Sequence, residues 1–228
     1  GATTGVHGCT SFYPHAVGEE FELGLQHRSR SMLSSFCQAD YIWDAADREG
    51  LTAFVINYPS GWPGNMKNGV ISTYTWNIPE TPDRILQKGK RTRYKQSSKK
   101  PLKAIKIVED RKIIEKIRSE LPPLEVLLQP REAKGTQKAY VSGTQSYDTL
   151  IVPSSAKNGE NWGKIPLNQW SSFISTIYEK DDNQIRALYK FRLTNVEDDG
   201  NLIKAEYSSV YSIDGWVNPP EHAEGLIR

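Results

Sequence analysis

The sequence predicts an α/β segment followed by a mainly antiparallel α+β unit, with a basic linker between the two. Three observations predict this division. A helical pattern, a glycine and a short apolar strand follow one another around residue 50, which is half of a βαβ unit. Lysines and arginines crowd residues 79–101. Strand-like runs separated by turn residues then fill residues 102–228.

The composition is that of an ordinary globular protein. Of the 228 residues, 37% are hydrophobic and 25% are charged, which allows one large domain or two small ones with a buried core. The net charge of +2 is too small to imply a nucleic-acid partner. No apolar run approaches the ~20 residues of a membrane span, so we predict none. Cys9 and Cys37 could pair or stay free, and the compartment is left open.

Residues 1–78 are predicted to form a partial parallel sheet with one helix. Asp40 is placed to cap a helix, and Gly50 lies where a helix C-terminal glycine belongs. The apolar run 51–57 then predicts a buried strand. The apolar positions of the helix are Ile42, Trp43 and Ala46.

Residues 79–101 are predicted to be a linker, because a run of like charges repels itself and seldom packs. We expect proteases to cut first between Arg84 and Lys100. The alternative is that this run binds a polyanion such as nucleic acid. Only Tyr94 would offer a base a stacking surface there.

Residues 102–228 are predicted to be a separable α+β unit with a mainly antiparallel sheet. One helix is expected over 109–120, from the spacing of its isoleucines. The segment Asp198 to Asn201 predicts a hairpin turn. The predicted strands are 102–108, 125–129, 138–142, 149–153, 173–179, 185–193 and 202–210.

Side chains with catalytic potential form no familiar motif. There is no phosphate-binding glycine loop, no nucleophile elbow and no paired-histidine zinc motif. The four histidines are scattered, and we expect structural roles for them; they are His7, His15, His27 and His222. Three tryptophans are expected in cores, with a ligand pocket as the alternative; they are Trp162, Trp170 and Trp216.

The loop from Tyr58 to Gly64 is the first place to look for function. It follows the predicted strand 51–57, and ligands of open α/β sheets usually bind beside the carboxyl ends of strands. Trp62 in this loop could face a ligand or simply pack the loop against the sheet.

Three stretches resemble the alkaline phosphatase superfamily, in its type I phosphodiesterase/nucleotide pyrophosphatase branch. Residues 1–9 are similar to the T-G-x-x-P-x-x-H-G segment that follows the nucleophile helix in that branch. Residues 41–63 resemble its P-I-W-x-x-A-x-x-x-G helix, the strand after it and its W-P-G-S loop. Residues 162–220 look like the domain that some bacterial members insert between the two halves of the catalytic sheet.

The resemblance implies that this chain is a non-catalytic internal fragment of a metal-dependent phosphodiesterase. The family's two metal ions, usually zinc, and its Thr or Ser nucleophile have no counterparts here, so no residue is assigned as catalytic or metal-binding. Four residues are expected near the substrate entrance of the intact enzyme: Tyr13, His15, Tyr58 and Trp62. The family's phosphate-contacting asparagine falls near Phe12, which departs from the nucleotide-specific pattern.

The implied partners are the rest of the parent catalytic domain and, in the intact enzyme, a phosphate-ester substrate. Apolar surface left uncovered by the missing sheet predicts self-association at high concentration. The alternative function is a non-catalytic module that binds a ligand or partner. In this interpretation 79–101 is the linker and 102–228 the cap domain.

Overall fold

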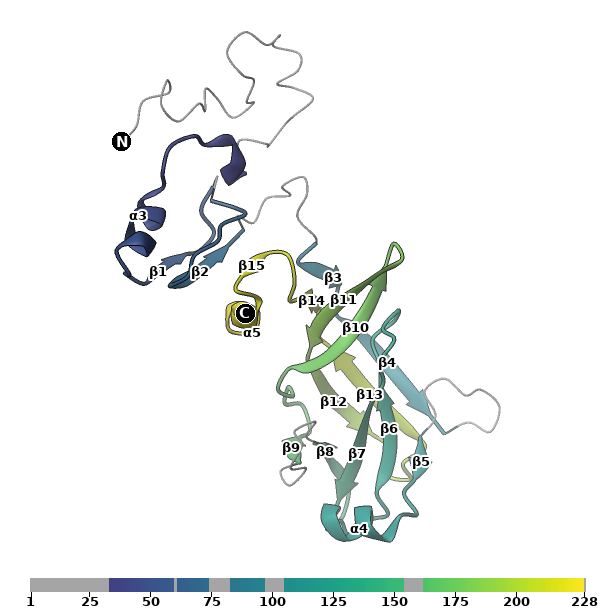
Figure 1. Cartoon of the computed structure of the whole chain (residues 1–228). Coiled ribbons are helices and arrows are strands. Elements are labelled where there is room, and N and C mark those ends of the chain that lie inside the picture. The colour runs from purple at the N-terminus through teal and green to yellow at the C-terminus, as the bar shows by residue number, and fades with distance from the viewer. Residues whose placement is uncertain (1–32, 60, 74–82, 97–104, 154–161, 228) are drawn as a thin grey trace. The chain divides into compact units, whose positions relative to one another are not determined.

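The computed structural model describes residues 33–59, 61–73, 83–96, 105–153 and 162–227 (Figure 1). Of these residues, 44% lie in strands and 14% in helices, so the protein is mostly β-sheet. Several of its sheets are antiparallel throughout. No helix in the described part of the chain is both long and apolar enough to cross a membrane.

The chain divides into two compact units. The first comprises Gly1–Arg84 and Ile213–Arg228, and the second comprises Ile85–Ser212. These limits differ from the predicted ones, since the second unit begins inside the basic run and the chain returns to the first unit at its end. The first unit is therefore built from two separate stretches of sequence.

The first unit contains a three-stranded sheet in the order β1-β2-β15 (Figure 1). β1 and β2 are parallel, as the helix–glycine–strand pattern predicts, and β15 runs antiparallel to β2. The described elements of this unit are η2 (Ser34–Phe36), α3 (Ile42–Arg48), β1 (Ala53–Val55), β2 (Gly69–Ser72), β15 (Val217–Asn218), η3 (Pro220–His222) and α5 (Ala223–Leu226).

Helix α3 begins one residue later than the capping prediction required. Its N-cap is Tyr41, whose backbone N–H donates to Asp44 Oδ2 at 3.2 Å. Asp40 instead forms an exposed ion pair with Arg48, 2.8 Å away, so its predicted capping role is wrong. The prediction for the other end is confirmed, because Gly50 follows the helix with φ +74°, a conformation that favours glycine.

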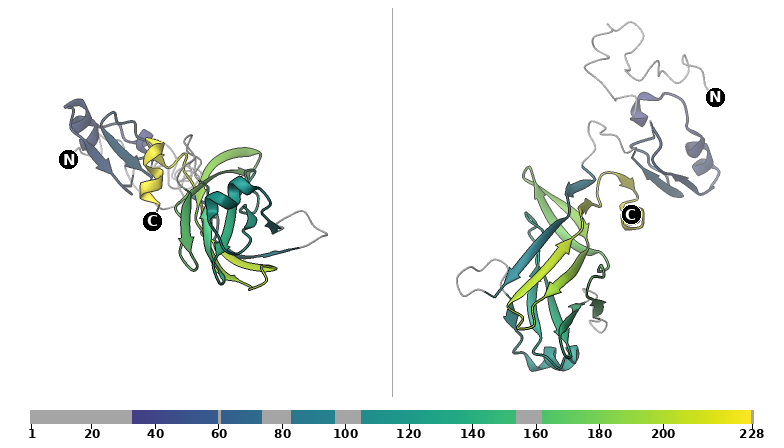
Figure 2. Two further views of the ribbon diagram at one scale, coloured as in Figure 1. Left: turned by 90° about the horizontal axis from the view of Figure 1, so that it is seen from below. Right: turned by 180° about the vertical axis from the view of Figure 1, so that it is seen from behind.

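In its described residues the second unit holds three antiparallel arrangements of strands, in the orders β5-β6-β7-β8-β9, β12-β13-β4 and β10-β11-β14-β3. These curve round a shared interior, with the short helix α4 at one end (Figures 1 and 2). The elements are β3 (Ile85–Gln87), β4 (Lys90–Lys95), β5 (Lys106–Ile107), α4 (Arg111–Ile117), β6 (Leu124–Leu128), β7 (Gln137–Gly143), β8 (Tyr147–Val152), β9 (Gly163–Pro166), β10 (Ile174–Lys180), β11 (Asn183–Tyr189), β12 (Phe191–Val196), β13 (Leu202–Tyr207) and β14 (Val210–Ser212).

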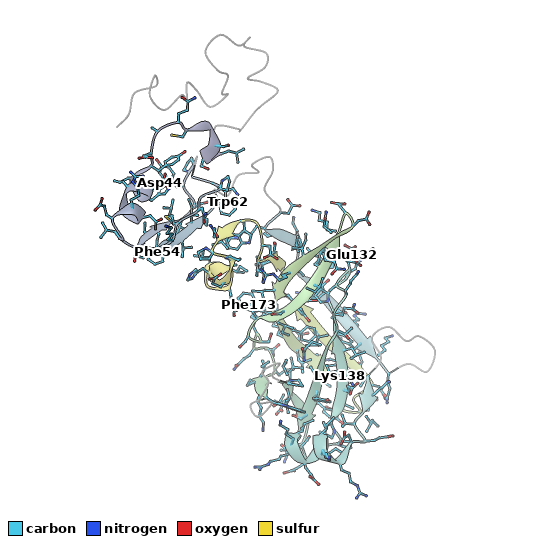
Figure 3. All side chains as sticks on the ribbon, in the orientation of Figure 1. Asp44, Phe54, Trp62, Glu132, Lys138 and Phe173 are labelled. Atoms are coloured by element: carbon cyan, nitrogen blue, oxygen red, sulfur yellow. The ribbon has the colours of Figure 1, made fainter. Side chains whose placement is uncertain are left out.

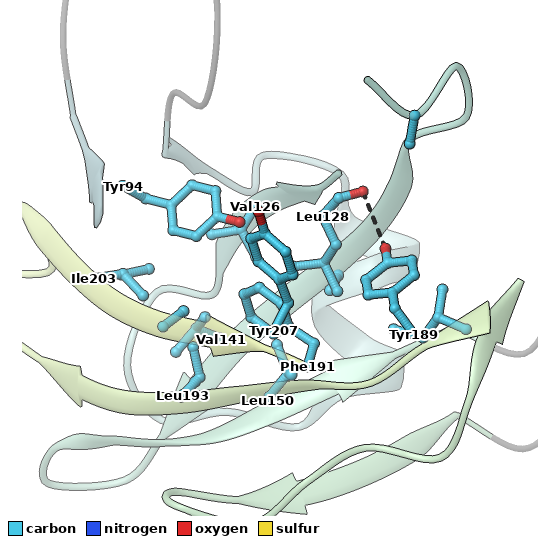
Figure 4. Packing of buried hydrophobic residues seen from close by; sticks show 14 of the residues in the cluster. Tyr94, Val126, Leu128, Val141, Leu150, Tyr189, Phe191, Leu193, Ile203 and Tyr207 are labelled. Atoms are coloured by element: carbon cyan, nitrogen blue, oxygen red, sulfur yellow. Dashed lines mark hydrogen bonds between the residues drawn. The ribbon is translucent and has the colours of Figure 1, made fainter. Parts of the chain in front are cut away.

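One apolar core joins the strands of all three arrangements (Figure 4). Val126 and Leu150 come from the five-stranded sheet, whereas Phe191 and Ile203 come from β12 and β13. All four side chains are at most 1% exposed. The phenol of Tyr189 donates a long hydrogen bond, 3.5 Å, to the Leu128 carbonyl. The alternation of inward apolar residues that predicted these strands is thus the pattern that builds the core.

The basic run is structured over most of its described length, contrary to the linker prediction. β3 pairs with β14, and all six residues of β4 pair with β13, from Lys90↔Tyr207 to Lys95↔Leu202. Tyr94 is 1% exposed and points into the core (Figure 4). The run of charges wrongly predicted a linker because the charged residues alternate with inward-facing ones in a strand. Arg91, Arg93 and Lys95 therefore occupy its outer face.

The chain bends at three neighbouring points, where β11 passes into β12, β13 into β14, and β3 into β4. β11 gives way to β12 at Lys190, whose N–H donates to Ser208 Oγ at 2.8 Å. Ser208 and Ser209 separate β13 from β14, and Ser209 Oγ accepts from the N–H of Gly89 between β3 and β4, at 3.3 Å. A Cβ on Gly89 would lie 2.7 Å from the Tyr207 carbonyl oxygen. The two serine hydroxyls and this glycine therefore let the sheet turn round the core.

The predicted helix and hairpin of this unit are confirmed. α4 begins at Arg111 and is capped by Asp110, whose side chain accepts from the backbone N–H of Lys112 at 2.9 Å. Antiparallel β12 and β13 flank the turn at Asp198 to Asn201. In that turn Asp199 Oδ1 accepts from the Asn201 N–H at 2.9 Å. Local side-chain acceptors therefore set both features.

Candidate functional site

The candidate site is the loop between β1 and β2 in the first unit, which contains the predicted segment from Tyr58 to Gly64. It begins at Asn57, which has φ +58°. The Asn57 N–H donates to Ser72 Oγ at 3.0 Å, and Ser72 is buried at the end of β2. Because β1 and β2 are parallel, this bond ties together the two carboxyl ends where a ligand of such a sheet is expected.

Three aromatic rings support the start of the loop. Tyr41 and Trp43 are stacked with their centroids 4.4 Å apart, and Tyr58 meets Trp43 edge-on at 5.1 Å. Trp43 is buried, whereas Tyr58 is 50% exposed. The Trp43 ring therefore positions Tyr58 and leaves part of the phenol ring in solvent, where a planar or apolar ligand group could contact it.

Trp62 packs against the small core of this unit (Figure 3). It is partly buried, and its carbonyl accepts from the Ser34 N–H at 2.7 Å. The cluster it contacts consists of Trp43, Val55, Met66 and Ile71. The packing role that the sequence left open for Trp62 is therefore present, and a role at a substrate entrance stays a prediction.

Two further residues hold the loop, and the sequence did not single them out. Asp47 on α3 accepts from the N–H groups of Lys67 at 3.0 Å and Asn68 at 2.8 Å. These two hydrogen bonds, Lys67 first, hold the pKa of the Asp47 carboxyl below its usual value. Asn218 on β15 donates its side-chain amide to the Gly64 carbonyl at 2.8 Å.

The structure brings together two of the four predicted entrance residues. Tyr58 and Trp62 both pack on the cluster that contains Trp43. Tyr13 and His15 lie outside the described residues. A ligand can be positioned by the exposed aromatic face, by the backbone groups that Asp47 fixes, and by the hydrogen-bonded base of the loop. None of these groups supplies a nucleophile.

Metal-binding side chains do not converge in the part of the chain that the structure describes. It holds no group of three or more His, Cys, Asp and Glu side chains suited to a metal ion. His222 follows β15 in η3. The Cys37 thiol donates to the Ala39 carbonyl at 3.3 Å. The described side chains therefore do not fit a pair of metal ions.

A groove of about 570 Å³ opens on the second unit beside β9 and β10. Trp170 lines it and is 41% exposed, in contrast to the expectation that it would close a core. The Arg192 guanidinium lies 4.5 Å above the Trp170 ring. Lys190 Nζ lies 4.5 Å above the ring of Phe173, which also lines the groove. The groove thus combines an exposed ring with polar walls.

The other two tryptophans pack as predicted. Trp216 is 3% exposed, and the Arg84 guanidinium lies 4.2 Å from its ring. Trp162 stacks on Tyr140 with the centroids 5.3 Å apart.

Comparison with known proteins finds no relative: no protein-family model, no curated protein and no solved structure matches this chain.

Proposed function

We propose that this chain is part of a metal-dependent phosphate-ester hydrolase of the phosphodiesterase type. In this proposal the first unit contributes part of an α/β catalytic core. The second unit is a domain inserted into that core, and it helps to cover the substrate. The motifs at residues 1–9 and 41–63 supply the family assignment.

The observation that carries the proposal is the way the first unit is interrupted. β15 pairs with β2, with Val217 opposite Ser72, although the whole second unit separates them in the chain. Thr73 N–H also donates to the Trp216 carbonyl at 2.8 Å. An independent unit between two paired strands is the connection expected of an inserted domain.

In the proposal the loop from Tyr58 to Gly64 borders the substrate entrance. Its base is fixed by Asn57 and Ser72, and its far end by Asn218. A loop held at both ends can present Tyr58 in one orientation, which lowers the entropy lost when a substrate binds. The metal ions and the nucleophile of such an enzyme would come from residues outside this arrangement, so no chemical step is assigned to it.

The open reading frame that contains this chain tests the assignment. We expect it to encode a Thr or Ser nucleophile upstream and a D-H-G motif downstream of the given residues. The encoded protein should cleave an activated aryl phosphodiester, and a chelator should abolish this turnover. A reading frame without these motifs, or a protein without chelator-sensitive turnover, would contradict the proposal.

Substitution of Trp62 tests the role of the loop in that enzyme. Trp62→Ala should change KM or kcat more than the melting temperature, whereas Trp62→Phe should largely restore the kinetics. Trp162→Ala in the second unit is the control, because this ring stacks on Tyr140. A lower melting temperature with unchanged kinetics for Trp62→Ala would leave Trp62 only the packing role.

The groove beside Trp170 favours a second candidate, a non-catalytic ligand-binding module. Its volume of about 570 Å³ lies within the range of small-molecule sites, about 300–1,000 Å³. Quenching of tryptophan fluorescence by a ligand, lost in Trp170→Ala and kept in Trp162→Ala, would support this function. If the full-length protein also lacks phosphodiesterase activity, the module replaces the hydrolase as the better proposal.

A further inference from the structure

The outer face of strands β4, β13 and β12 carries an excess of positive charge. Arg91 and Arg93 project from β4 on the side opposite Tyr94, and Lys204 projects from β13 on the side opposite Ile203. Arg192 occupies the same face of β12. The one carboxylate among the charged residues of these registers is Glu206. With Lys95 at the end of β4, five cations therefore share this face with one anion.

Two of these cations oppose each other directly. The antiparallel register places Arg93 of β4 opposite Lys204 of β13. Both are exposed, and neither forms an ion pair with another described residue. Like charges at directly opposed positions destabilise a sheet, because their Cβ atoms are only about 4.5–5.5 Å apart. A cost of this kind is offset when an anion binds between the two side chains.

The neighbouring carboxylate is already occupied. Glu206 accepts from Arg192 Nε at 2.9 Å and from Arg192 Nη2 at 2.6 Å, and it pairs with Arg91 Nε at 2.8 Å. The hydrogen bonds from Arg192, assisted by the charge of Arg91, hold the pKa of Glu206 below its usual value. Glu206 thus remains ionised and fixes both guanidinium groups, and it is not available to neutralise Arg93 or Lys204.

A hollow of about 380 Å³ lies over these residues. Its described lining contains three cations, two threonines, one alanine and the carboxylate that the arginines already hold. Of the two threonines, Thr194 faces outward from β12. Thr194 can donate a hydrogen bond from its hydroxyl. The lining residues are Arg91, Thr92, Arg93, Thr194, Lys204, Ala205 and Glu206.

We propose that this hollow binds a compact polyvalent phosphate, of the size of a diphosphate or triphosphate group. Arg93 and Lys204 would bind the phosphate oxygens from two adjacent strands, and Thr194 would donate to a third. Arginine and lysine side chains recognise phosphate through charge-assisted hydrogen bonds. The site is made of residues of the second unit and shares none with the loop at Tyr58, and it does not depend on the proposed hydrolase function.

A nucleic-acid strand is the less suitable occupant. The sequence offered Tyr94 as the only stacking surface in this run, and Tyr94 is 1% exposed in the core. Single-strand binding without sequence preference relies on aromatic rings on which bases stack. The hollow itself contains no aromatic residue in its described lining. The exposed Trp170, which lies 4.5 Å from the Arg192 guanidinium, does not line the hollow. The chemistry of the hollow itself is therefore that of a phosphate site without a base platform.

Calorimetric titration with inorganic tripolyphosphate tests the proposal on the full chain at low salt. The double variant Arg93→Gln/Lys204→Gln should bind at least about tenfold more weakly, since it loses two charge-assisted contacts. Arg111→Gln/Lys112→Gln removes the same charge from exposed positions of α4 and should change the affinity less than about twofold. Equal losses in the two double variants, or no binding to the unaltered chain, would overturn the site.

Lys204→Glu separates binding from folding. This variant should lose tripolyphosphate binding and melt at a higher temperature, because Glu at this position can pair with Arg93 across the strands. Loss of binding together with a lower melting temperature would contradict the like-charge argument. A short single-stranded oligonucleotide is the competing probe: tighter binding than tripolyphosphate at equal phosphate concentration would overturn the compact-anion assignment.

Discussion

The two units of this protein are stabilised in different ways. In the described part of the first unit, the helix α3, the strands β1 and β2 and the loop before β2 contribute to a small cluster of four buried residues, Trp43, Val55, Met66 and Ile71. In the second unit one continuous cluster reaches across three strand arrangements, from Tyr94 on β4 to Val210 on β14. The first unit depends on loops that are hydrogen-bonded to its helix and strands, through side chains such as Asp47 and Asn218.

This difference indicates where each unit is vulnerable. A large core loses much free energy when one side chain is truncated, because the cavity cannot collapse completely. The stability of a small sheet with hydrogen-bonded loops is more sensitive to changes in the polar side chains that hold those loops. Substitutions and pH should therefore act on the two units by different routes, and four measurements test this difference.

The largest effect is expected from Phe191→Ala. Phe191 is 1% exposed and packs near Tyr94, with the ring centroids 6.2 Å apart. Truncation of a buried Phe typically costs about 3–5 kcal/mol of unfolding free energy, which urea denaturation measures. Hydrogen exchange should show faster exchange in β12 and β13 and unchanged exchange in β2. Faster exchange in β2 as well would break the separation between the units.

Alkaline pH should act on the second unit next. Burial, together with a hydrogen bond to Glu132 Oε2 at 2.9 Å, raises the pKa of Tyr178 to about 12. A raised pKa means that its stabilising effect is complete below the unfolded value of about 10 and is lost as pH rises through about 12. Tyr178→Phe should therefore reduce the loss of melting temperature over this range. An unchanged alkaline profile would contradict this role.

Acid pH should act on the first unit through Asp47. Its pKa is below the ordinary 3.8 because its carboxylate accepts from Lys67 and Asn68. A lowered pKa means that the stabilisation is present above the unfolded value and is lost as pH falls through the folded one. Asp47→Asn should flatten the loss of amide protection at residues 67 and 68 below about pH 4. A steep loss that persists in the variant would point to another acid.

The smallest effect distinguishes the two acids at the start of α3. Asp40→Ala removes only an exposed ion pair with Arg48 and should cost about 0.5 kcal/mol or less. Asp44→Ala removes the acceptor for the Tyr41 N–H and should cost about 1 kcal/mol, as for other capping contacts. Thermal denaturation of both variants measures the difference. A larger loss for Asp40→Ala would restore its predicted role as the cap.

The strands of the second unit could be predicted where alternation is plain. In β6 the pattern of Leu124, Val126 and Leu128 places apolar side chains inward at every second position. β4 has the same alternation, with Thr92 and Tyr94 inward. Charge on its outer face hides that pattern, so the sequence alone predicts a linker. The pairing of β4 with β13 depends on residues about a hundred positions away, which local patterns do not contain.

Part of the candidate site could also be predicted from the sequence. The position of the loop after a predicted strand identified Tyr58 and Trp62 from sequence. The prediction that this strand is buried was wrong, because Phe54 in β1 is 71% exposed. Asp47 gave no signal, because a helical aspartate is usually solvent-exposed, and its partners lie 20 and 21 residues away. Asn218 lies 154 residues from Gly64, and only the return of β15 to the sheet brings them together.

The shared bend at Gly89, Lys190 and the two serines has a consequence for changes of length. A residue inserted next to Gly89 would shift β4 by one position while leaving β3 in register. Since side chains alternate between the two faces, Tyr94 would leave the core and the neighbouring arginines would turn into it. Insertions at the bend should therefore prevent folding, whereas insertions at the exposed turn of Asp181 and Asp182, between β10 and β11, should be tolerated. The bend thus divides the sequence into segments whose lengths can vary and segments whose lengths are fixed.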